Sequence, residues 1–200
     1  MIATVRSLKT SDLADAVTLD LQIFGGWWSL QSYQEELQRS SSSLLGLWLQ
    51  VDRDNTDTVM GLPSVSSPQL VGIGCLWRVL DEAHITILGV HPQYQGRVLG
   101  QALLVSLLQT AHYHQSARAT LEVRAANTVA VALYTKFGFQ TAGQRPQYYD
   151  NGDNALILWR GQLQSSQFLR SLHQWQQETK ERLAACDSTQ LHINLTERLD

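Results

Sequence analysis

The feature that most constrains this sequence is a change of apolar periodicity near residue 92. Before it, residues 70–79 and 84–90 are apolar and β-branched, as is typical of strands. Residues 92–96 form a turn. Apolar residues then recur at helical spacing through residues 97–112, at Leu99, Leu103, Leu104, Leu107 and Leu108. The middle of the chain is therefore predicted to run strand, turn, helix.

The flanking segments predict further short elements. Strands are expected at 5–8, 44–51, 119–125, 139–141 and 155–160, with the strand 44–51 pairing with 70–79. Helices are expected at 13–23, 30–39 and 128–137, the last ending before Gly138. Residues 52–69 are polar and form a long loop, which is either functional or partly disordered. This order predicts an α+β fold, with helices flanking a mostly antiparallel sheet.

The segment after Gly161 has a different pattern. Apolar residues share one helix face there, and Gln, Glu and Lys occupy the other; the apolar residues are Phe168, Leu172, Trp175 and Leu183. We therefore expect a domain at residues 1–161 and an amphipathic helical extension at 162–200. Its apolar stripe needs a partner, so the extension is a candidate for docking or self-association.

Composition excludes several classes of protein. The net charge is −3 and the pI is about 6.0, which argues against direct binding of nucleic acid through bulk charge. The longest apolar stretch, residues 44–49, is too short for a membrane helix. Two cysteines suggest a reducing, cytoplasmic setting. The six histidines have no metal-ligand spacing, so no metal is expected.

Residues 95–101, Q-G-R-V-L-G-Q, open the central helix. A helix N-terminus offers free amides and a positive dipole end to a phosphate group. Gly96 and Gly100 permit close approach, and Arg97 adds a charge. The segment matches neither the P-loop nor the G-x-G-x-x-G pattern. Taken alone, it is better explained as an ordinary turn before a helix.

Three further motifs strengthen that signal. They are V-H-P-Q-Y-Q at 90–95, L-E-V-R-A-A-N at 121–127 and A-L-Y-T-K-F-G-F at 132–139. Together they closely resemble the GNAT family of acetyl-CoA-dependent N-acetyltransferases, over about residues 80–158. Within that family the sequence is most similar to the enzymes that acetylate the N-terminal alanine of a ribosomal protein.

The resemblance implies where acetyl-CoA binds. Its pantetheine arm would lie along Leu88, Gly89 and Val90, where this strand separates from its neighbour. Its pyrophosphate would be held by the cradle, meaning Gly96, Arg97, Val98, Leu99, Gly100 and Gln101. Asn127 matches a further cofactor contact. Val98 departs from the family pattern, which has glycine there, and so loses easy access to positive φ and adds bulk near a phosphate.

The resemblance also implies the reacting groups. Glu122 matches the general base that deprotonates the amine, and Tyr134 the general acid for the leaving thiolate. From the strand alone, Glu122 and Arg124 would be a surface ion pair. The resemblance places Trp27 and Trp28 on one wall of the acceptor groove and Tyr148 and Tyr149 on the other. At least one of the tryptophans is expected to fill the core instead.

These observations predict an enzyme that acetylates a protein or peptide N-terminus, such as that of a ribosomal protein. An acetyltransferase for a lysine, a polyamine or another small amine is the near alternative. A non-catalytic module that binds CoA or a partner protein is the more distant one, and Val98 is the residue that favours it. The acidic pair Asp81 and Glu82 is a candidate for attracting the acceptor ammonium group.

Overall fold

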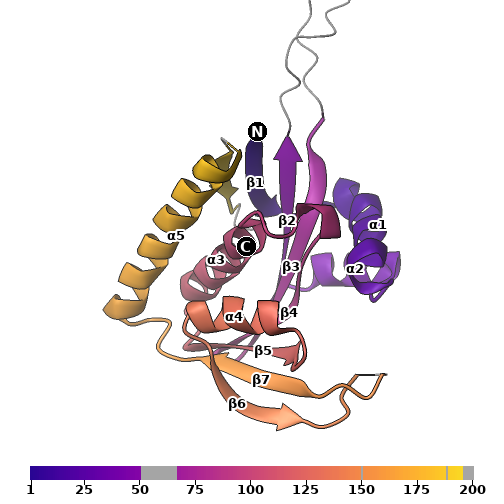
Figure 1. Cartoon of the computed structure of the whole chain (residues 1–200). Helices are drawn as coiled ribbons and strands as arrows, with labels where there is room; N and C mark the ends of the chain where they lie inside the picture. The colour runs from indigo at the N-terminus through magenta and orange to yellow at the C-terminus, as the bar shows by residue number, and fades with distance from the viewer. Residues whose placement is uncertain (51–66, 150, 188, 196–200) are drawn as a thin grey trace, which may run out of the picture.

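The computed structural model describes residues 1–50, 67–149, 151–187 and 189–195. A mixed sheet of eight strands runs through the molecule in the order β6-β7-β5-β4-β3-β2-β1-β8 (Figure 1). Its strands are β1 (Ile2–Ser7), β2 (Ser42–Gln50), β3 (Gln69–Val79), β4 (Glu82–Val90), β5 (Arg118–Arg124), β6 (Gln140–Arg145), β7 (Ala155–Arg160) and β8 (Gln190–Asn194). Among the described strands, only β4–β5 and β1–β8 pair in parallel, which confirms the mostly antiparallel α+β fold.

Helices cover both faces of this sheet (Figure 1). One side carries α1 (Leu13–Phe24) and α2 (Leu30–Gln38), and the other α3 (Leu99–Tyr113), α4 (Thr128–Lys136) and α5 (Ser166–Asp187). Each side has its own apolar core, and the larger lies around α3, where Leu103, Leu104 and Leu107 are fully buried. Short 3₁₀ helices, η1 (Thr10–Asp12) and η2 (Pro92–Tyr94), precede α1 and α3.

The helix ends follow from local chemistry. Ser29 caps α2 by accepting a hydrogen bond from the Ser32 amide. Gly25 follows α1 at φ +82°, and Gly138 follows α4 at φ +78°, a conformation that costs glycine little. A side chain at Gly138 would also require the Arg160 guanidinium to move.

Strand β6 differs from its predicted bounds. The strand expected at 139–141 spans Gln140–Arg145, because it forms a hairpin with β7. Strand β4 has a bulge at Thr86, which has no partner between the pairs Cys75–Ile87 and Leu76–Ile85. Gly89 is required because a Cβ there would lie 2.5 Å from the Phe24 ring, where α1 packs on the sheet.

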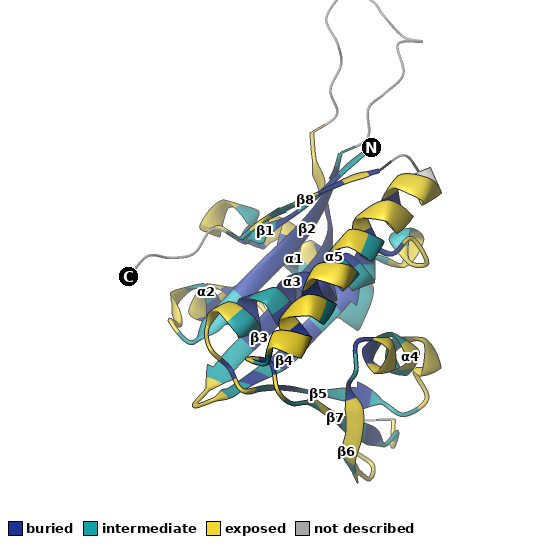
Figure 2. Ribbon diagram, turned by 90° about the vertical axis from the view of Figure 1, so that its left-hand side faces the viewer, coloured by how far each residue is buried: buried dark blue, intermediate teal, exposed yellow. Residues whose placement is uncertain are grey.

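The C-terminal segment folds back onto the sheet and α3 (Figure 2). Phe168, Leu172 and Leu183 of α5 are buried in the larger core. The chain then adds β8 parallel to β1, a strand that the sequence did not predict. The apolar stripe of the extension is therefore covered by this chain. Docking of another protein through the extension stays a prediction, and such a protein would have to bind the polar face of α5.

The loop predicted at 52–69 lies largely outside the described residues. Within the described ranges, every helix is too short or too polar to cross a bilayer. Cys75 is buried and Cys186 is exposed, and neither forms a disulfide.

Candidate active site

The site is built on a fork between two parallel strands. β4 and β5 pair only through Glu82–Arg118, Ala83–Ala119 and His84–Thr120, and then separate. Beyond the fork, β4 still pairs with β3 and β5 still pairs with β7. The separation that the resemblance implies for residues 88–90 is therefore present in the fold.

The backbone of β4 supplies polar groups to this fork. His91 donates its amide to Val71 of β3, so the Val90 amide and carbonyl point the other way, away from β3. The Val90 carbonyl accepts from the Gln95 side chain at 3.0 Å. Leu88 has the same parity as Val90 along the strand and directs its backbone to the same side. The fork is thus lined by main-chain groups that no neighbouring strand uses.

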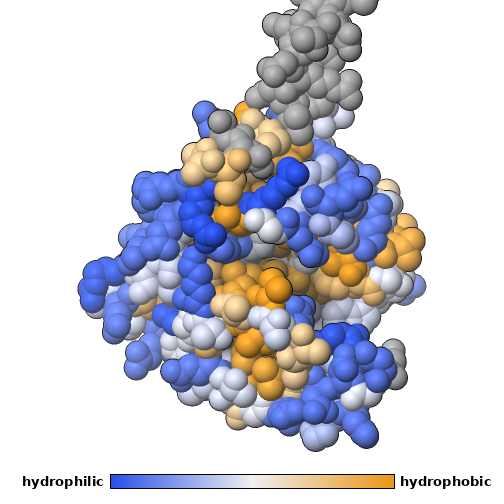
Figure 3. Space-filling view, viewed as in Figure 1, coloured by the Kyte–Doolittle hydropathy of each residue, from blue (hydrophilic) through white to orange (hydrophobic). Residues whose placement is uncertain are grey.

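The turn into α3 leaves its amides open. No side chain caps this helix, and a Cβ added at Gly96 would meet nothing within 4 Å. At Gly100 the nearest atoms would be 3.9 Å away. Free amides under open space fit the diphosphate of acetyl-CoA. Figure 3 shows an apolar band across the middle of this face, next to the hydrophilic surface of α5.

Val98 adopts the backbone conformation that glycine would have. It lies at φ +66° and ψ −4° as the residue before α3, with its side chain 7% exposed in the core. A left-handed conformation is strained for a β-branched residue. The cradle therefore keeps the geometry of a glycine turn, and Val98 turns its bulk into the core.

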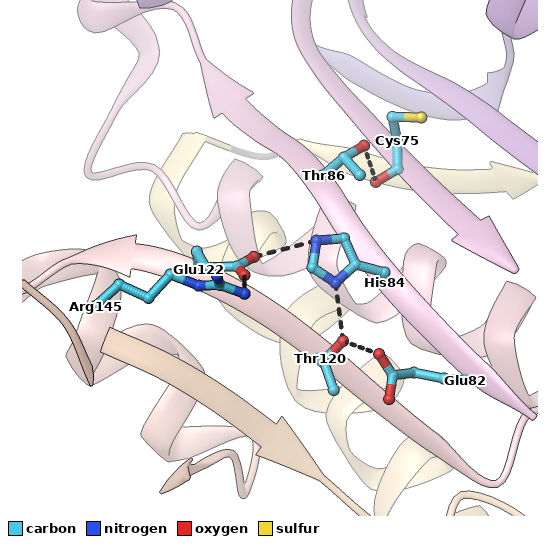
Figure 4. A network of polar contacts seen from close by, with 7 residues as sticks. All are labelled: Cys75, Glu82, His84, Thr86, Thr120, Glu122 and Arg145. Carbon is cyan, nitrogen blue, oxygen red and sulfur yellow. Dashed lines mark hydrogen bonds and ion pairs between the residues drawn. The ribbon is translucent and has the colours of Figure 1, made fainter. Parts of the chain in front are cut away.

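Glu122 lies on β5 just beyond the last pair of the fork (Figure 4). Its Oε2 is 3.1 Å from His84 Nε2, and its Oε1 is 3.3 Å from the Arg145 guanidinium. Leu121 and Val123 point to the opposite face and are buried, as the alternation predicts. Arg124 pairs with Asp153 at 3.0 Å, so the alternative Glu122–Arg124 surface pair is not formed.

The hydrogen bonds around His84 fix where its protons lie. The Thr120 hydroxyl donates its only hydrogen to Glu82 Oε1, at 2.8 Å. It must then accept from His84 Nδ1, which lies 2.9 Å away. Nδ1 therefore carries a proton, and Nε2 on the other side of the ring lies 3.1 Å from Glu122 Oε2. The polar chain Glu82–Thr120–His84–Glu122 thus links β4 and β5 at the fork.

Tyr134 lies on α4 and is 6% exposed. Burial, and then the nearby Tyr149, raise the pKa of Tyr134 above its ordinary value, so its hydroxyl keeps its proton. In the described part of the chain this hydroxyl has no hydrogen-bond partner. It is also not one of the unpaired polar atoms that are fully buried from solvent. It remains a donor for a group in the site.

Asn127 has a structural task. Its side-chain oxygen accepts from the Ala130 amide at 3.1 Å and caps α4, the helix that carries Tyr134. A cofactor contact by Asn127 would therefore use its amide group, and that contact stays a prediction.

The two tryptophans after α1 have different environments. Trp27 is 59% exposed, whereas Trp28 packs on the smaller core with its ring 5.2 Å from Tyr33. Buried Asp20 holds this turn, because its Oδ1 accepts from the Trp27 amide at 2.5 Å and its Oδ2 from the Tyr33 hydroxyl at 2.9 Å. Among the described residues, no contact joins either tryptophan to Glu122 or Tyr134.

The loop after β6 does reach the reacting groups. Tyr148 and Tyr149 stack edge to face at 5.2 Å. The Arg124 guanidinium lies 3.9 Å from the centre of the Tyr149 ring, and Arg145 approaches Tyr148 at 5.7 Å. Arg145 also contacts Glu122, so Tyr148 and Glu122 are linked through one side chain.

Sequence reasoning missed some of the polar groups of the site. His84 and Arg145 belong to no motif in the sequence, and neither was singled out as a site residue. Asp81 and Glu82, predicted to attract the acceptor, both lie against Arg118, at 3.4 and 3.0 Å. Glu82 also holds Thr120, so these carboxylates are already engaged by the protein. Within the described ranges no group of His, Cys, Asp and Glu could hold a metal.

Comparisons with known proteins agree with this geometry. Residues 61–154 match the family model for the acetyltransferase (GNAT) domain. The ribosomal protein bS18-alanine N-acetyltransferase of Escherichia coli K12 is 30% identical over 158 residues, which are 78% of this chain and 95% of that protein. N-alpha-acetyltransferase RimI of Mycobacterium tuberculosis is 32% identical over 149 residues, 73% of this chain and 84% of that protein.

Solved structures share the same architecture. The crystal structure of the E. coli ribosomal-protein-S18-alanine N-acetyltransferase has a TM-score of 0.65 at 29% identity, and covers 80% of this chain and 94% of its own. The NatC complex bound to Gag peptide and CoA includes a chain with a TM-score of 0.63 at 18% identity, covering 80% and 99%. At that identity the likeness concerns the fold alone.

Proposed function

This chain belongs to the GNAT acetyltransferases and is an acyltransferase of the RimI type, and on that premise we propose that it acetylates the N-terminal α-amine of a protein, using acetyl-CoA in a ternary complex. The observation that carries the proposal is the Glu122–His84 pair at the mouth of the fork. The acceptor we propose is the N-terminal alanine of a ribosomal protein bS18, because the relatives are named for that reaction.

Deprotonation of the acceptor is the first requirement. A free α-amine has a pKa of about 8, so much of it is charged near neutral pH. Glu122 Oε2 and His84 Nε2 lie 3.1 Å apart at the fork. An ammonium proton passed to that point, directly or through a water, leaves a neutral amine ready to attack. Arg145 keeps the other carboxylate oxygen in place.

Acetyl-CoA supplies the acetyl group as a thioester. The Val90 amide, directed into the fork, is placed to donate to a developing oxyanion. The Tyr134 hydroxyl is protonated and unengaged within the described chain, so it is the donor for the leaving sulfur. We assign the pantetheine contacts to Leu88, Gly89, Val90 and Asn127, and the diphosphate contacts to Gly96, Arg97, Val98, Leu99, Gly100 and Gln101. The acceptor walls are Trp27 and Trp28 on one side and Tyr148 and Tyr149 on the other.

A peptide assay tests this function. Purified protein is incubated with acetyl-CoA and a peptide that begins with alanine, and the product is analysed by mass spectrometry. We expect acetylation at the α-amine. A peptide with a blocked N-terminus and a free lysine should stay unmodified, as should spermidine. Equal rates on these free amines would overturn the N-terminal assignment, and no turnover with any amine would favour the non-catalytic alternative.

A further inference from the structure

The C-terminal extension reaches the edge of the cofactor cradle. α5 runs antiparallel to α3, since Gln176 contacts Gln109 and Arg182 contacts Gln101, closer to the N-terminus of α3. Burial of Leu183 next to Arg182, and pairing of β8 with β1, fix this end of α5. Arg182 is therefore held beside the first turn of α3.

Two cationic side chains, those of Lys136 and Arg182, donate hydrogen bonds to the same neutral oxygen atom at that turn. Gln101 Oε1 accepts from Lys136 Nζ at 2.9 Å and from Arg182 Nη1 at 3.1 Å. The two side chains come from the end of α4 and the end of α5, and both residues are exposed. In the described part of the chain neither cation lies within 4.0 Å of a carboxylate oxygen. Their mutual repulsion is offset by the Gln101 amide dipole and, for Lys136, by the Phe137 ring 5.7 Å away, and neither partner carries a charge, which leaves both cations available to an anion.

The chemistry of acetyl-CoA identifies that anion. The uncapped N-terminal turn of α3 suits the diphosphate, but the molecule carries a separate phosphate monoester on its ribose 3′ oxygen. A dianionic monoester is best held by charged donors on more than one side. We propose that Arg182 and Lys136 bind the 3′-phosphate of acetyl-CoA, so that the C-terminal extension completes the cofactor site. This inference rests on the proposed use of acetyl-CoA.

Calorimetric titration with CoA and with 3′-dephospho-CoA tests it. The unmodified protein should bind CoA about tenfold more tightly than dephospho-CoA. R182Q and K136Q should each weaken CoA binding about three- to tenfold and leave dephospho-CoA binding unchanged. R170Q is the matched control, since it removes the same charge from an exposed position at the other end of α5.

The outcomes separate the two proposals. If the unmodified protein binds both ligands equally, or if R182Q and K136Q weaken both ligands alike, the 3′-phosphate assignment is wrong and the use of acetyl-CoA stands. If R170Q lowers CoA affinity as much as R182Q, the effect is general attraction and the assignment is wrong. If neither ligand binds at millimolar concentration, the proposed function falls, and this inference falls with it.

Discussion

Glu122 Oε2 and His84 Nε2 lie 3.1 Å apart across the fork, and the other ring nitrogen of His84 is hydrogen-bonded to the Thr120 hydroxyl at 2.9 Å. E122Q should lower kcat by about 10²- to 10³-fold, because an amide cannot take the amine proton. H84Q should lower kcat less, about tenfold, since Glu122 is kept but loses its partner. Steady-state rates with an alanine peptide measure both effects.

The matched variant is T120V, which removes both hydrogen bonds of the Thr120 hydroxyl, from His84 and to Glu82, and keeps the Glu122 and His84 side chains. Its kcat should lie between those of H84Q and the unmodified enzyme. The melting temperature of each variant separates a local effect from loss of the fold. An E122Q enzyme with normal turnover would exclude Glu122 as the base.

Tyr134 should act as a donor over the whole working pH range. Because burial raises its pKa above the usual value of about 10, its hydroxyl stays protonated at neutral and mildly alkaline pH. We expect Y134F to lower kcat about 10²-fold with little change in the KM for acetyl-CoA. The rate of the unmodified enzyme should show no fall below about pH 10 that Y134F abolishes.

The same shift has a consequence for stability. A phenol whose folded pKa is raised stabilises the fold fully below the unfolded pKa of about 10, and this contribution is lost as the pH rises above it. Urea unfolding at pH 9 and pH 11 should therefore show a steeper alkaline loss for the unmodified protein than for Y134F. A loss of equal size in both proteins would contradict the buried, neutral state of Tyr134.

Replacing Trp27 should affect binding of the acceptor peptide, whereas replacing Trp28 should affect stability of the fold. Trp27 is 59% exposed, so W27A should raise the KM for the acceptor peptide and leave the free energy of unfolding within about 0.5 kcal/mol. Trp28 packs on Tyr33 and the smaller core, so W28A should cost about 2–3 kcal/mol. Chemical denaturation and peptide kinetics on both variants decide between these roles. An unchanged KM for W27A would remove Trp27 from the acceptor wall.

At position 98 a glycine variant should be more stable than an alanine variant, the reverse of the usual order within a helix. V98A keeps the strained φ of +66°, which costs an L-residue about 1–2 kcal/mol, whereas V98G adopts it freely. After the entropic cost of glycine, V98G should still be more stable than V98A by about 0.5–1 kcal/mol. A130G in α4 is the control, and there glycine should be worse than alanine by about 1 kcal/mol. A V98G protein less stable than V98A would mean that this turn is unstrained.

The sequence predicted the central elements well because their signals are local. The period change at residue 92, the N-cap at Ser29 and the glycines after α1 and α4 each act within a few residues. His84 and Glu122 meet only because β4 and β5 pair in parallel for a few residues, and no local pattern encodes that register. The motif that identified Glu122 therefore could not indicate its partner.

The C-terminal extension also makes contacts that local sequence patterns could not predict. Its apolar stripe predicted a helix correctly, yet not which surface covers it, and the brief strand β8 has no pattern that separates it from a loop. Arg182 likewise carries no motif, and its place beside Gln101 follows only from the way α5 packs on α3. Long-range packing decides these contacts, and amphipathicity indicates only that some partner is needed.

The extension should be part of the folded domain. The Trp175 ring lies 4.9 Å from Phe137 and 5.1 Å from the Arg160 guanidinium, and Phe137 follows the helix that carries Tyr134. W175A should therefore lower the free energy of unfolding by about 2–3 kcal/mol, and K180A, an exposed change on the same helix, by less than about 0.5 kcal/mol.

A chain ending at Gly161 should lose more. It exposes Phe137 and the larger core, and it leaves β1 as an open sheet edge prone to pair with other chains. We expect a lower melting temperature and a larger mass in solution by light scattering than for the full chain. A truncated protein that melts at the same temperature and keeps the same mass would show that the extension is dispensable for folding, in conflict with the packing of Trp175 and β8.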